Sequence, residues 1–73
     1  VILCDTGPVV ALIDRNDPYH DRCQAALPSL GNNALMTTIP CLTEAMYLLH
    51  RAGRISAQEE LWQFIEDQLV IVF

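Results

Sequence analysis

The stretch Val1-Ile2-Leu3-Cys4-Asp5-Thr6-Gly7-Pro8 decides the fold of this 73-residue chain. Four successive apolar residues are typical of a buried strand in the middle of a parallel sheet. Thr6-Gly7-Pro8 predicts the end of that strand, which places Asp5 at its carboxyl end. In open α/β sheets ligands bind at this edge. Asp5 is therefore the first candidate functional residue, although a carboxylate at this point can equally cap a following helix.

Working outward from this stretch, strand and helix patterns alternate along the chain. The apolar segments 34–37 and 69–73 predict two further strands, and each interval between strands predicts two helices. The sequence thus predicts an α/β fold with a parallel sheet covered on both faces. Right-handed crossovers would add the strands in one direction, so that the first strand lies at an edge, next to the second.

Three local signals predict where helices begin. Asp17 can cap a second helix that has Pro18 in its first position and stops before Pro28, whereas the first helix is expected at residues 9–14. Thr38 can cap a third helix that ends before Gly53. Ser56-Ala57-Gln58-Glu59 has the pattern of a capping box and predicts the start of a fourth helix. Its inward stripe is expected to contain Ala57, Leu61, Phe64 and Ile65.

Glu44 is the second candidate functional residue. It lies in the otherwise apolar helical segment 41–49, where burial would penalise its charge. Two carboxylates in apolar surroundings, Asp5 and Glu44, need a cation between them, and a divalent metal is expected to fill this role.

Composition limits the classes of protein to consider. The chain is 52% apolar and 18% charged, which is more apolar surface than one small domain can hide. Either a partner covers this surface or part of the domain is absent. The net charge of −5 argues against bulk electrostatic binding of nucleic acid, but it does not exclude a nuclease whose acids hold metal ions.

The cysteines and the apolar runs indicate the cellular compartment in which the protein is expected. Cys4, Cys23 and Cys41 lack the spacing of a structural zinc site and are expected to be buried thiols in a reducing cytoplasm. No apolar run is long enough to cross a bilayer, so no membrane partner is expected.

Three segments, 5–14, 17–20 and 42–49, together resemble a PIN domain, the family that includes the VapC-type toxins. The resemblance implies a three-layer fold, of which residues 1–73 would form the N-terminal portion with the order β-α-α-β-α-α-β. It also implies a metal-dependent endoribonuclease that uses Mg²⁺ or Mn²⁺. Asp5 would match the first acid of the site, Glu44 the second, and Thr6 a neighbouring hydroxyl residue. The remaining acids would belong to an absent C-terminal portion.

The same resemblance implies the partners. An RNA substrate, an antitoxin protein and a second copy of the complete protein are expected, and Arg51, two turns after Glu44 on the predicted helix, could contact RNA phosphate. Two other hypotheses stay open. The chain could be a non-catalytic PIN-like module that binds a protein partner. It could also be a phosphotransferase of the haloacid dehalogenase type, but these enzymes carry a second Asp where this chain has Gly7.

Overall fold

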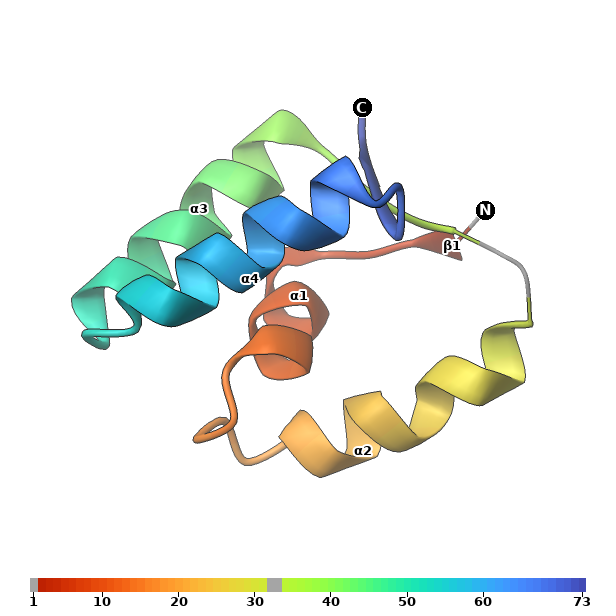
Figure 1. Ribbon diagram of the computed structural model, residues 1–73, viewed down its shortest axis with the longest axis horizontal. Coiled ribbons are helices and arrows are strands. Elements are labelled where there is room, and N and C mark those ends of the chain that lie inside the picture. The colour runs from red at the N-terminus through yellow and green to blue at the C-terminus, as the bar shows by residue number, and fades with distance from the viewer. Residues whose placement is uncertain (1, 32–33) are drawn as a thin grey trace.

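The computed structural model describes residues 2–31 and 34–73 (Figure 1). Val1, Asn32 and Asn33 lie outside the described residues; a turn at Gly31-Asn32-Asn33, which the sequence also predicts, is therefore described only at Gly31. The elements are β1 (Ile2–Leu3), α1 (Thr6–Ile13), α2 (His20–Ala26), the 3-10 helix η1 (Leu27–Leu30), β2 (Leu35–Thr37), α3 (Ile39–Arg51), α4 (Ile55–Glu66) and β3 (Val70–Val72). The predicted α/β class and the predicted alternation of strands and helices are confirmed.

The strands form a three-stranded parallel sheet in the order β1-β2-β3. Ile2 pairs with Leu35, and Leu35 pairs with Val70 in the next strand. The predicted strand order, with β1 at an edge, is therefore confirmed. Such an arrangement follows from two crossovers that each return the chain to the same side of the preceding strand.

The helices of the described chain cover one face of this sheet. Ile2, Leu35 and Val70 form a row across the strands, and all three pack into a cluster with Leu12 of α1. Side chains alternate along a strand, so the next row faces the other way. In that row Leu3 is 71% exposed and Ile71 39% exposed. The apolar strands predict a sheet covered on both faces in a complete domain, with helices in this chain for barely one and a half faces; in the described residues only one face is covered.

The first helix lies at the centre of the fold. In Figure 1, α1 lies between the antiparallel pair α3 and α4 and the more distant α2. All residues from 9 to 13 are buried, as expected of a helix that is apolar on every side. Its contacts with α3 and α4 form the main core, which comprises Val9, Val10, Ile13, Ala45, Leu49, Ala57 and Leu61.

Three helices begin elsewhere than predicted, α1 and α2 among them. The first, α1, starts at Thr6 instead of residue 9, because the Asp5 carboxylate accepts a hydrogen bond from the Thr6 amide. Pro8 is compatible with this start because amides in the first turn have no intrahelical acceptor. The second, α2, starts only at His20, because the carboxylate of Asp17 accepts the Tyr19 amide in a turn that precedes the helix.

The start of α4 also differs, whereas that of α3 is confirmed. Thr38 caps α3 and accepts a hydrogen bond from the Cys41 amide at 3.4 Å. Ser56 forms no capping box, since α4 begins at Ile55 and its N-cap is Arg54, without a side-chain cap. A tight connection explains this, because Arg54 donates its amide to the Leu49 carbonyl and accepts the Gln58 amide. The turn requires a positive φ at residue 53, and Gly53 adopts a φ of +73° without strain because it has no Cβ atom.

Thr37 provides a first testable prediction. Its side chain is fully buried, and its hydroxyl has no hydrogen-bond partner among the described residues. A buried unpartnered hydroxyl costs about 1–3 kcal/mol. Thr37→Val, which replaces the hydroxyl with a methyl group of similar size, is expected to raise the free energy of unfolding by about 1 kcal/mol. Urea denaturation measures the change, and a loss of stability would mean that the hydroxyl has a partner in solution.

Candidate functional site

Asp5 lies at the carboxyl edge of the sheet, where β1 passes into α1. Its carboxylate oxygen Oδ1 accepts the Thr6 amide at 2.8 Å and the Cys41 thiol at 3.3 Å. The Thr6 hydroxyl in turn donates to the Cys41 carbonyl at 3.4 Å. These contacts bring the first turn of α3 against the start of α1, so the predicted position of Asp5 at a strand end is confirmed, together with its role as a helix cap.

The same contacts lower the pKa of the Asp5 carboxyl below its ordinary value. The hydrogen bond from the Thr6 amide is the larger cause, and the bond from the Cys41 thiol adds to it, while slight desolvation opposes both. Donors that bind the ionised form favour that form. Asp5 is exposed and keeps its negative charge at neutral pH, as a cation ligand must.

Glu44 is an exposed residue of α3, so its expected apolar surroundings are not found. The helix is apolar on the side that packs on α1, where Ala45 and Leu49 are buried, and Glu44 lies outside that stripe. Burial therefore gives no reason to place a metal between the acids. What links them is Cys41, which contacts Asp5 and lies one helical turn before Glu44 on the same side of α3.

Thr6 and Arg51 occupy very different positions. Thr6 is buried, and its hydroxyl is used in the contact with the Cys41 carbonyl. Thr6 therefore positions α3 against α1. Arg51 is exposed in the last turn of α3. It lies about 10 Å along the helix from Glu44, at the end away from Asp5.

Cys41 is the residue of this site that the sequence reasoning missed. Its thiol and its carbonyl contact Asp5 and Thr6, respectively. The available signal was its spacing, since Cys41 follows the Thr38 cap by one turn and precedes Glu44 by one turn.

The donors at this edge suit a hard divalent cation such as Mg²⁺ or Mn²⁺. Carboxylate oxygens are the preferred ligands of such ions, and Asp5 and Glu44 could each supply one. The described residues contain no group of three or more histidine, cysteine or acidic side chains arranged to hold a metal. Two carboxylates would leave most of the ion's ligand positions to water.

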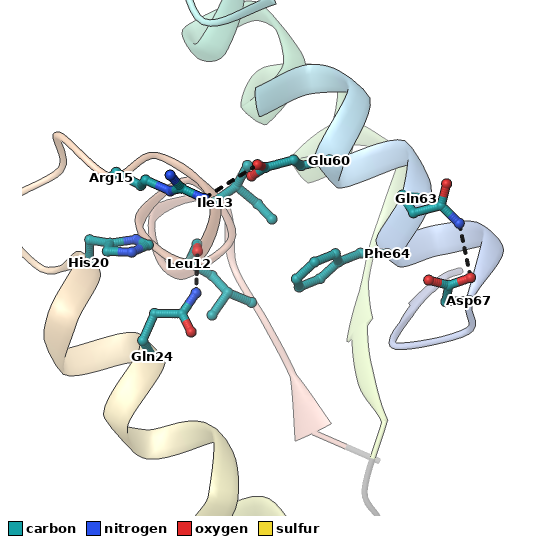
Figure 2. Close-up of a pocket in the computed structure, with 9 residues that line it drawn as sticks. All are labelled: Leu12, Ile13, Arg15, His20, Gln24, Glu60, Gln63, Phe64 and Asp67. Carbon is teal, nitrogen blue, oxygen red and sulfur yellow. Dashed lines mark hydrogen bonds and ion pairs between the residues drawn. The ribbon is translucent and has the colours of Figure 1, made fainter. Parts of the chain in front are cut away.

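A separate cavity lies at the opposite end of α1, about 12 Å along the helix from Asp5. It is open, has a volume of about 550 Å³, and lies between the ends of α1, α2 and α4. Figure 2 shows Phe64 pointing across it toward Leu12, while Arg15 and Glu60 approach one another along its rim in a 3.9 Å ion pair. Its size is that of many ligand sites.

The polar side chains of this cavity have structural roles. The ring nitrogen Nδ1 of His20 lies 2.8 Å from the Ala11 carbonyl, and the Gln24 amide donates to the Leu12 carbonyl at 3.1 Å. Carbonyls in the last turn of a helix lack intrahelical partners, so these α2 side chains complete the end of α1. His20 and Gln24 are therefore both engaged in contacts within the protein.

Cys4 follows β1 and packs against both apolar clusters of the core. Burial raises the pKa of the Cys4 thiol, and nearby Cys23 raises it further. All three cysteines are half-buried and free.

Comparison with known proteins gives no match to a family model, to a curated protein or to a solved structure. Within residues 2–31 and 34–73, no helix has both the length and the hydropathy to span a membrane.

Proposed function

We propose that this chain belongs to a metal-dependent endoribonuclease of the PIN type, in which Asp5 and Glu44 are metal ligands and catalytic residues. The observation that supports this most directly is the contact between Asp5 and the first turn of α3 at the carboxyl edge of the sheet. This edge is where α/β proteins bind ligands, and Cys41, which contacts Asp5, lies one turn before Glu44 on α3.

A divalent ion bound there would acidify an attacking water and stabilise charge on the leaving oxygen of a phosphodiester. The protein residues would hold and orient that ion. Asp5 has one oxygen engaged by the Thr6 amide and the Cys41 thiol, and its other oxygen has no protein partner among the described residues. Arg51, at the far end of α3, would contact a phosphate away from the reacting one.

Two carboxylates bind a divalent ion weakly and give no anchor for a second ion. The resemblance assigns the remaining acids to a portion of the fold that follows the segments matched here. We therefore propose that the three-layer PIN-like fold and full activity need that portion, and that the complete protein acts on RNA as a cytoplasmic, homodimeric toxin restrained by an antitoxin.

The open face of the sheet favours the second candidate, a PIN-like module that binds a protein partner without catalysis. Leu3 and Ile71 on that face are exposed, and Phe73, just beyond β3, is 80% exposed. Apolar side chains gathered in this way mark interaction surfaces. This function needs no metal, so metal binding separates the two candidates.

Mn²⁺ titration followed by electron paramagnetic resonance tests the proposal. Wild type is expected to bind the ion weakly, and Glu44→Gln is expected to weaken binding at least tenfold, because the amide keeps the shape of the side chain but loses its charge. Glu59→Gln, an equally exposed change on α4, serves as the matched control and should bind as wild type does. Equal binding by wild type and Glu44→Gln would remove Glu44 from the site and favour the interaction module.

A further inference from the structure

Two of the three cysteines lie beside one small cavity. Cys4 of the β1–α1 connection and Cys23 of α2 both line a pocket of about 170 Å³ whose other walls are apolar, among them Pro8, Leu12 and Leu27. Both cysteines also pack against the cluster of Leu12, Leu35 and Val70. The two cysteines therefore lie beside the same open apolar pocket, although they are far apart in the sequence.

The helix that carries Cys23, α2, lies at the surface of the molecule and packs on α1. None of the residues of α2 is fully buried. Its attachment depends on Cys23 and on the two side chains, His20 and Gln24, that complete the end of α1. The cavity between α2 and β1 provides space for a small movement of α2 toward β1.

We propose that Cys4 and Cys23 form a disulfide under oxidising conditions and thereby link α2 to the edge of the sheet. The two thiols lose two protons and two electrons as the S–S bond forms. The oxidant is a peroxide, which is reduced to water, or a diazene carboxamide such as diamide, which becomes the corresponding hydrazine. This inference does not depend on the proposed nuclease function.

The third cysteine is not expected to take part. The Cys41 thiol donates to the Asp5 carboxylate and does not line the cavity between Cys4 and Cys23. The structure thus selects one of the three pairings that three cysteines allow.

Diamide treatment of the wild-type protein, followed by thiol titration and mass spectrometry, tests the proposal. Free thiols are expected to fall from three to one, and the mass of the monomer should fall by two hydrogens. Chymotrypsin separates the three cysteines, because it cuts after Leu12, Tyr19, Leu30 and Leu35. The non-reduced digest should then contain the Cys4 peptide joined to the Cys23 peptide. A link to Cys41, a dimer between chains or three unreacted thiols would overturn the proposal.

Two variants give matched controls. Cys41→Ser should form the link as wild type does, whereas Cys23→Ser should not form it. In oxidised wild type the equilibrium constant for unfolding is expected to fall about 100-fold, because the link closes a loop of the unfolded chain. Amide exchange in α2 should slow as well. Unchanged stability and unchanged exchange in a protein shown to carry the link would contradict the attachment of α2 to the sheet.

Discussion

Leu61→Ala is expected to lower the free energy of unfolding by about 3 kcal/mol, the largest stability change among the substitutions considered. Leu61 is fully buried between α4 and the rest of the main core, which includes Leu49 and Val9. Truncating a buried leucine removes its transfer free energy and leaves a cavity, which together cost about 2–5 kcal/mol. A chain of this length has a total stability of only about 4–11 kcal/mol. The variant should therefore keep only about 1–8 kcal/mol of stability.

Trp62→Ala is the matched control for this change. Trp62 is the next residue of α4 but is 53% exposed, so its truncation removes more atoms while emptying no space in the core. Its cost is expected to stay within about 1 kcal/mol. Urea denaturation followed by far-ultraviolet circular dichroism measures both variants. If Leu61→Ala and Trp62→Ala cost the same, the packing of α4 on α1 is different from that described here.

The pattern of apolar residues predicted much of this fold because burial in the sheet and in α1 depends on a few continuous segments. The run before Asp5 and the apolar segments at 34–37 and 69–73 each became a strand, and crossover handedness ordered them. The inward stripe of α4 was also predicted, since Ala57 and Leu61 are buried.

Helix starts were predicted less well because they depend on competition between nearby caps. Ser56 and Glu59 have the spacing of a capping box, but the tight turn at Gly53 starts α4 two residues too early for Ser56 to act as the cap. The Asp17 carboxylate likewise accepts the Tyr19 amide in the turn before α2 and does not cap the helix itself. Such outcomes depend on how a loop joins two packed helices, which a local pattern does not contain.

The candidate site was predicted in part. The position of Asp5 followed from the strand that precedes it, whereas the burial of Glu44 was inferred from apolar neighbours in the sequence. A helix buries only one stripe, and Ala45 and Leu49 belong to that stripe while Glu44 does not. Cys41 was missed because its contact with Asp5 joins two helix starts that are distant in the sequence.

The final prediction separates the two roles of Asp5, which caps α1 and is the first proposed metal ligand. Asp5→Asn keeps an oxygen that can accept the Thr6 amide, and asparagine caps helices as well as aspartate does. The fold should therefore stay intact at neutral pH. Loss of an outer-shell partner of a metal ligand lowers metal affinity roughly 10-fold to 100-fold. Removing the charge of a direct ligand should therefore weaken Mn²⁺ binding by at least this factor. The Asp5→Ala variant should show both weaker Mn²⁺ binding and a less stable α1.

The pH dependence of stability gives an independent measure of the same carboxylate. Its pKa in the folded protein lies below the ordinary value of 3.8, so its contribution is present above that pH and is lost as the pH falls through the folded pKa. Urea denaturation across the acid range should show a shallower loss of stability for Asp5→Asn than for wild type, with exposed Asp21→Asn as the control. If Asp5→Asn reduces the acid dependence but leaves Mn²⁺ binding unchanged, Asp5 is a helix cap alone. Asp5 would then have no place in the proposed metal site.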